Sequence, residues 1–181
     1  MSEGFAALVS RLLKNQGVTT MSADSNQART APAHPFSALV KGGLVVGSLD
    51  IAYAIIFSAF RGFGPIRILQ SVAAGLLGKS SFQGGLPTAA LGLALHYFIA
   101  FTIVILYWMA SRPLPILTAH PVVCGAIYGL GVYFFMNYVV IPLSAANRPR
   151  FFLLLFICNL LVHAFLIGVP AALFARKARV G

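Results

Sequence analysis

Three ionisable side chains lie deep within long apolar runs of this chain. Asp50 lies within residues 37–60, His96 within 86–110 and His163 within 151–174. Asp50 is also the only acidic residue beyond the first 24 positions. An ionisable group at the centre of a bilayer costs about 2.5 kcal/mol or more, so such residues usually have a partner and often a function. These three side chains are the strongest indication of chemistry in the sequence.

Three kinds of chemistry suit an aspartate with two histidines. A hydrogen-bond network would fix the register of the helices, because a carboxylate can accept bonds from imidazole and amide groups. Proton or ion handling is the second, because loss of water disfavours the charged forms of both groups and brings them towards neutrality. The third is a cofactor: His96 and His163 as axial haem ligands, or both with Asp50 around a metal ion.

No HxxxH or ExxH pair accompanies these residues, so the sequence predicts no cofactor and leaves haem or metal as an alternative. His96 and His163 come from the second and fourth apolar runs, which would be diagonal neighbours in a simple four-helix bundle. Two amides complete the candidate cluster. Asn159 lies one helical turn before His163, and Asn137 lies in the third run, somewhat off its centre.

Small residues share the helical faces that carry these polar groups. In lipid, helices gain little from apolar burial against each other, so small residues that allow close approach become important. Asp50 lies on such a face and should point towards another helix rather than lipid. We expect the small residues to pack within one chain, with a homodimer interface as the alternative. The candidate packing residues are Gly43, Gly47, Gly92, Gly125 and Gly129.

The composition requires a membrane to cover so much apolar surface. Of the 181 residues, 59% are hydrophobic and 9% charged, with a mean hydropathy of +0.89, whereas soluble domains carry about 25% charged residues. A span of ~30 Å of hydrocarbon needs about 20 mostly apolar residues. Four segments meet that requirement, near residues 38–60, 86–110, 121–143 and 151–174.

A short helix is predicted between the first two spans, at about residues 65–77. Pro65 suits the first turn of a helix and Gly78 suits its end. A helix of that length reaches only ~20 Å, too short to cross a bilayer, so an interfacial or re-entrant position is expected. The predicted fold is therefore all-α: an integral membrane bundle of four transmembrane helices plus this short amphipathic helix.

The chain divides into three parts on this interpretation. Residues 1–36 form an N-terminal amphipathic segment and a flexible tail, within which Met21 is an alternative start. Residues 37–176 form the four-helix transmembrane domain, and residues 177–181 form a basic C-terminal tail.

The formal charge of +10 arises from thirteen Lys and Arg residues against three acids. These basic residues lie in the tails and connections, which favours anionic lipid head groups over nucleic acid as the partner. Eight of them fall on the side of the two termini and five on the other side. The positive-inside rule therefore predicts cytoplasmic termini.

No catalytic motif accompanies the polar cluster. The sequence contains no G-x-S-x-G elbow, P-loop, dinucleotide fingerprint or HExxH motif, and nothing nominates a nucleophile. A non-enzymatic membrane protein is expected, with an accessory subunit of a larger membrane complex as an alternative.

Several stretches resemble a family of small, uncharacterised bacterial inner-membrane proteins with four spans, over about residues 40–176. The stretches are GSLDIAYAIIFSAFRG (47–62), RILQSVAAGLLG (67–78), GGLPTAALGLALHYFIAFTIVILYW (84–108), VYFFMNYVV (132–140) and LLVHAFLIGVPAAL (160–173). They contain Asp50, His96, Asn137 and His163. The resemblance implies a multi-pass fold in the bacterial inner membrane and brings no established activity.

Overall fold

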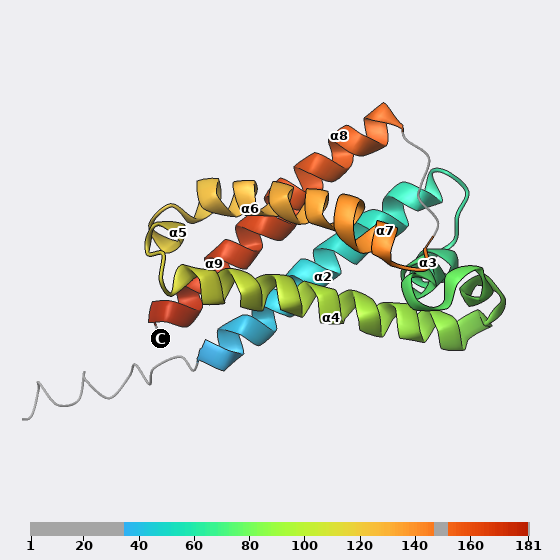
Figure 1. Cartoon of the computed structure of the whole chain (residues 1–181), viewed down its shortest axis with the longest axis horizontal. Helices are drawn as coiled ribbons and strands as arrows, with labels where there is room; N and C mark the ends of the chain where they lie inside the picture. The colour runs from blue at the N-terminus through green and yellow to red at the C-terminus, as the bar shows by residue number, and fades with distance from the viewer. Residues whose placement is uncertain (1–34, 147–151, 181) are drawn as a thin grey trace, which may run out of the picture. The chain divides into compact units, whose positions relative to one another are not determined.

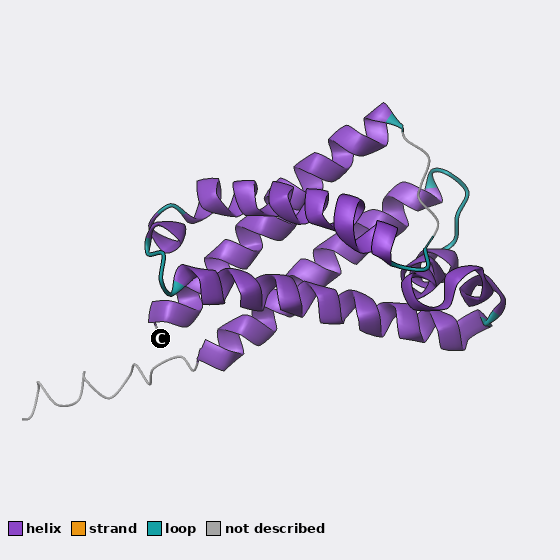
Figure 2. Ribbon diagram, in the orientation of Figure 1, coloured by secondary structure: helices purple, strands orange, loops and turns teal. Residues whose placement is uncertain are grey.

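A computed structural model of the chain describes residues 35–146 and 152–180. Every regular element within those ranges is a helix, and they contain no strand (Figure 2). Residues 1–34 of the predicted amphipathic segment and tail, with Met21, lie outside the described residues, whereas Pro35 and Phe36 begin the first helix.

Four helices are long and apolar enough to cross a membrane, which confirms the predicted fold class and makes this a multi-pass membrane protein. The first two are continuous: α2 (Pro35–Ala59) and α4 (Gly85–Ser111). The third comprises α6 (Pro121–Phe135), η2 (Met136–Val140) and α7 (Ile141–Leu143). The fourth comprises α8 (Leu153–Val162), η3 (His163–Gly168) and α9 (Val169–Val180). The predicted basic tail at 177–181 is thus helical as far as Val180.

The third and fourth spans each contain one π-helical turn, η2 and η3, which ends two residues before a proline. The prolines are Pro142 and Pro170. Proline lacks an N–H, and its ring clashes with the carbonyl four residues earlier, so a regular α-helix cannot continue unchanged through it. The wider π-turn is the local adjustment that lets both spans continue across the bilayer.

The fourth span is the centre of the bundle (Figure 1). α2 lies beside α9, and both α4 and α6 also pack against α9. The expectation that the second and fourth spans lie diagonally was therefore wrong. The reason is the small size of the α9 surface, where Ala171, Ala172 and Ala175 are fully buried and allow three helices to approach.

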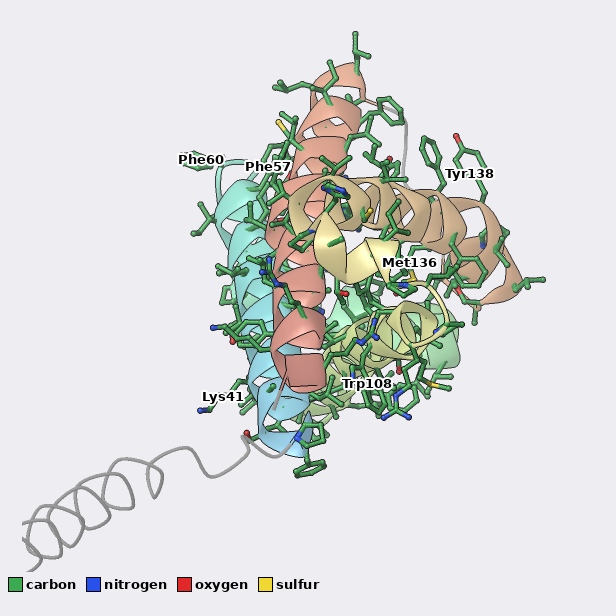
Figure 3. All side chains as sticks on the ribbon, turned by 90° about the vertical axis from the view of Figure 1, so that its left-hand side faces the viewer. Lys41, Phe57, Phe60, Trp108, Met136 and Tyr138 are labelled. Carbon is green, nitrogen blue, oxygen red and sulfur yellow. The ribbon has the colours of Figure 1, made fainter. Side chains whose placement is uncertain are left out.

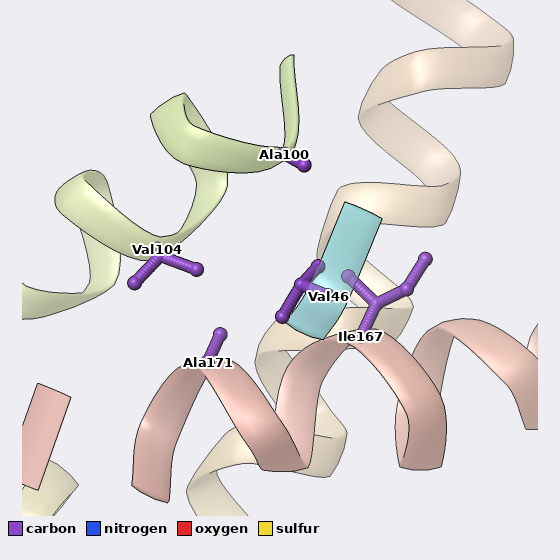
Figure 4. Close-up of a cluster of buried hydrophobic side chains, with 5 residues drawn as sticks. All are labelled: Val46, Ala100, Val104, Ile167 and Ala171. Atoms are coloured by element: carbon purple, nitrogen blue, oxygen red, sulfur yellow. The ribbon is translucent and has the colours of Figure 1, made fainter. Parts of the chain in front are cut away.

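One buried apolar cluster joins α2, α4 and the fourth span (Figure 4). Val46 and Val104 are fully buried in it, beside small alanine side chains. Its members are Val46, Ala100, Val104, Ile167 and Ala171. Large apolar side chains elsewhere on the spans are exposed, among them Ile56, Phe98, Ile127 and Phe165. An apolar exterior over a small-residue interior is the distribution that a lipid environment favours.

All five candidate packing glycines lie at contacts between elements. A Cβ added at Gly92 would meet the backbone carbonyl of Leu69 in the short helix, and one at Gly129 would meet that of His163. Gly125 faces the carbonyl of Gly168. Gly43 and Gly47 instead face aromatic rings of α4, those of Phe101 and Tyr97.

The short helix α3 (Pro65–Leu77) follows its predicted bounds, begins with Pro65 and ends at Gly78. Gly78 has a φ of +62°, a conformation that favours glycine, and its N–H donates to the carbonyl of Ala74. The buried Gln70 amide donates to the carbonyl of Gly85 at 3.0 Å, which ties α3 to the start of α4. The short 3₁₀ segment η1 (Gly78–Gln83) and the single turn α5 (Ile116–Ala119) complete the connections.

We predict that Gly129→Ala destabilises the bundle by about 1–3 kcal/mol, because the added methyl group overlaps a backbone carbonyl that cannot move independently. The control is Gly131→Ala on the same helix, where a Cβ would meet nothing within 4 Å. Its effect should stay within about 0.5 kcal/mol. Thermal unfolding in detergent, followed by circular dichroism, measures both. Equal losses would contradict the close contact at Gly129.

Candidate functional site

Asp50 on α2 faces His96 on α4. The Nδ1 atom of His96 lies 3.9 Å from Oδ2 of Asp50, and the two side chains are 10% and 30% exposed. This distance is beyond a direct hydrogen bond but within the range of an ion pair or a single bridging molecule.

The other ring nitrogen of His96 is hydrogen-bonded to α2. Nε2 lies 2.8 Å from the carbonyl oxygen of Gly47. A carbonyl can only accept, so Nε2 carries a hydrogen and donates it. In a neutral imidazole the remaining nitrogen is then an acceptor. Nδ1 therefore presents a lone pair towards Asp50, and two acceptors face each other unless a proton or a donor lies between them.

A small cavity adjoins this pair. It has a volume of about 20 Å³ and is lined by Asp50, His96 and apolar side chains that include Val46 and Ile167. A polar cavity above about 10–15 Å³ can hold one water molecule if polar partners are present. One water donating to the carboxylate and to Nδ1 would satisfy both acceptors.

His163 supplies a second imidazole near Asp50. It is the first residue of the π-turn η3, and its Nδ1 lies 2.9 Å from the carbonyl oxygen of Asn159. Nδ1 is therefore the donor, which leaves Nε2 free to accept or carry a proton. Asp50 interacts electrostatically with both His163 and His96. The ring of Tyr133 on α6 meets His163 edge-on at a centroid distance of 5.1 Å.

Tyr53 joins the cluster, although the sequence analysis did not select it. Its hydroxyl donates to Oδ1 of Asn159 at 3.0 Å, which links α2 to α8. The signal in the sequence was its position: Tyr53 lies three residues after Asp50 and so shares a face of the helix with it.

Asn137 makes a different contact from the one expected. Its amide donates to the carbonyl oxygen of Tyr133 at 2.9 Å, within its own helix. No hydrogen bond in the described part of the chain joins Asn137 to Asp50 or to either histidine. The structure therefore brings together Asp50, His96, His163 and Asn159, with Tyr53, and leaves Asn137 beside them.

Haem ligation by His96 and His163 stays an alternative. The cavity beside Asp50 and His96 has a volume of about 20 Å³, and His163 does not line it. Among residues 35–146 and 152–180, no three His, Cys, Asp or Glu side chains lie close enough together to hold a metal ion.

A larger apolar groove lies on the other side of two isoleucines. It has a volume of about 500 Å³ and runs between α4 and the third span, where Met136 is visible in Figure 3. Its two hydroxyl groups are already bonded to backbone carbonyls, Thr102 to Phe98 and Tyr128 to Ile103. Ile99 and Ile103 line both this groove and the small cavity. The side chains of Ile99 and Ile103 thus separate the Asp50–His96 pair from the larger apolar groove.

We predict that Tyr53→Phe lowers the stability of the bundle by about 0.6 kcal/mol, the average value of an interhelical hydrogen bond in a membrane. The matched control is Tyr138→Phe, because Tyr138 is 70% exposed and its hydroxyl has no partner among the described residues. That variant should unfold at the wild-type temperature. Equal losses of stability in the two variants would show that the hydrogen bond from Tyr53 to Asn159 does not stabilise the bundle.

Comparison of the chain with protein-family models, with curated proteins and with solved structures returned no match. The resemblance to small bacterial four-span proteins stays a prediction.

Proposed function

We propose that this membrane protein binds and releases protons at the Asp50–His96 pair within the bilayer. One observation carries the proposal: Nε2 of His96 donates to the Gly47 carbonyl, so Nδ1 faces Asp50 as an acceptor at 3.9 Å. Opposing acceptors that are largely shielded from water are unfavourable, and binding a proton removes the conflict.

The Asp50–His96 pair has a loaded state, which holds the extra proton in one of two forms, and an empty state without that proton. In the loaded state, one proton lies either on Nδ1, giving an imidazolium beside a carboxylate, or on Asp50, which then donates towards a neutral imidazole. In the empty state both groups are acceptors, and one water in the adjoining cavity can donate a hydrogen to each. Loading therefore adds one proton and one positive charge to the site, whichever atom holds the proton.

In this proposal His163 is the second side chain that binds and releases the proton. Its Nδ1 is fixed by Asn159, and its Nε2 remains available. The titratable groups around Asp50 come from two neighbouring spans and from its own helix: His96 from α4, His163 from the fourth span and Tyr53 from α2. Cys158 of α8 and Tyr133 of α6 in turn adjoin Tyr53. Movement of a proton between two imidazoles past a carboxyl is the chemistry of an intramembrane proton relay.

We further propose a bacterial inner membrane with cytoplasmic termini as the location. The basic residues at the end of α9, Arg176, Lys177 and Arg179, support this orientation. A lipid bilayer is then the first partner, with an accessory role in a larger membrane complex or a homo-oligomer as further possibilities for the same fold.

We expect Asp50→Asn to abolish a pH-driven proton flux that the wild-type protein conducts in liposomes. The amide keeps the size of the side chain and its capacity to accept a hydrogen bond, but it cannot titrate. A pH-sensitive dye inside the vesicles measures the flux under an imposed gradient. In the infrared spectrum, the protonated-carboxyl band of Asp50 should weaken as pH rises, because the proton leaves the pair, and Asp50→Asn should lack that band.

Ser48→Ala is the control, because Ser48 lies on the same helix and bonds Tyr97 rather than the pair. Its flux should equal that of the wild type. Flux that persists unchanged in Asp50→Asn, or a wild-type protein without any flux, would contradict proton transfer and leave the cluster as a structural network.

A further inference from the structure

A polar notch lies where α4 and α9 end. Along α4 it begins at Trp108, about three turns beyond His96. It has a volume of about 330 Å³ and is lined by Trp108, Arg112, Ala178 and Arg179. Figure 3 looks onto this end of the bundle and labels Trp108. Tryptophan and arginine at the end of a membrane span lie at the depth of lipid head groups.

The two arginines are held in place by the bundle. Nη1 of Arg179 donates to the carbonyl of the buried Ser111 and to the Thr118 hydroxyl, so the other N–H groups of the guanidinium remain for a ligand. The guanidinium carbon of Arg112 lies 4.5 Å from the centre of the Trp108 ring, a cation–π contact that fixes its position.

Among the described residues, no acidic side chain balances these two charges. Asp50 is the only acidic residue in the described ranges, and it lies deep in α2. The only carboxylate contact found there is that of Asp50 with His96. An anionic ligand would supply a counter-charge for Arg112 and Arg179.

Trp108 also lines the notch, and its indole has a hydrogen-bond donor left unpaired by the described residues. Its Nε1–H is buried and has no acceptor among the described residues. A buried indole N–H normally finds an acceptor, because leaving it unpaired costs free energy. The notch thus combines two guanidinium groups with the ring of Trp108, whose unpaired N–H lies beneath the surface, and no acidic side chain of the described residues lines it.

We propose that this notch binds the phosphate group of an anionic phospholipid such as phosphatidylglycerol. Phosphate oxygens accept from guanidinium and indole donors alike, and planar guanidinium groups bind phosphate through paired hydrogen bonds. A zwitterionic lipid carries the same phosphate, but it brings a cation towards two fixed positive charges. This site is independent of the proton-binding pair.

Trp108 reports on the site directly, because it is the only tryptophan in the chain. Purified protein in a neutral detergent is titrated with short-chain phosphatidylglycerol, short-chain phosphatidylcholine, or sodium phosphate, while the tryptophan emission is recorded. Phosphatidylglycerol should shift the emission at a concentration at least about tenfold lower than phosphatidylcholine does, the equivalent of one charged hydrogen bond. Equal effects of the two lipids would overturn the proposal, and an equal effect of sodium phosphate would overturn the lipid assignment.

Arg112→Gln and Arg179→Gln should each weaken the response to phosphatidylglycerol by about tenfold or more. Lys177→Gln is the control, since it removes the same charge at the same end from a side chain that rests on Phe174 outside the notch. If Arg179→Gln fails to fold, Arg112→Gln remains as the test, because the guanidinium of Arg112 contacts only the Trp108 ring among the described residues. For Trp108→Phe, native mass spectrometry should find fewer bound phosphatidylglycerol molecules than in the wild type. An unchanged response to phosphatidylglycerol in both arginine variants would contradict the proposal.

Discussion

Close backbone contact at small residues is the constraint on which this bundle depends. Lipid chains and neighbouring helices offer an apolar side chain much the same surroundings, so helices associate where their backbones can approach. Gly92 admits the carbonyl of Leu69, and Gly129 admits that of His163. The second contact also bears on the site, because it fixes the backbone of a candidate proton carrier against α6. Packing and chemistry therefore share residues in this protein.

The same constraint determines the state of His96. Gly47 brings α2 close enough to α4 for its carbonyl to receive the His96 Nε2 hydrogen. That hydrogen bond selects the tautomer, and the tautomer directs a lone pair at Asp50. A larger residue at 47 would therefore disturb the hydrogen bond that orients His96 without touching either Asp50 or the imidazole directly. Ile99 and Ile103 complete the arrangement from the other side, as an apolar partition between the pair and the groove.

Much of the fold could be predicted from the sequence because a bilayer imposes one length on every span. Pro65 and Gly78 likewise marked the short helix, since each has a conformational preference that suits only one end. The depth of Asp50 and His96 was also visible, because position along a span follows from residue number. Which spans adjoin was not visible, because the four apolar runs are similar in composition. The alanines of α9 recur at helical spacing, but that spacing does not tell which helices pack against them. Tyr53 was overlooked because tyrosine in a membrane protein is usually interfacial. Asn137 was selected as a polar residue of the third span, and its position does not tell whether its amide bonds a neighbouring helix or, as here, the carbonyl of Tyr133 in its own.

The alanine surface of α9 makes the spans unequal in their freedom to evolve. Leucine, isoleucine, phenylalanine and valine can replace one another wherever a side chain meets only lipid, so the outer surfaces of α2, α4 and α6 can drift widely. At Ala171, Ala172 and Ala175 every direction is occupied by another helix, and each added methyl group would separate elements that also align the polar cluster. The fourth span should thus act as the slowly changing part of the chain, around which the other three diversify.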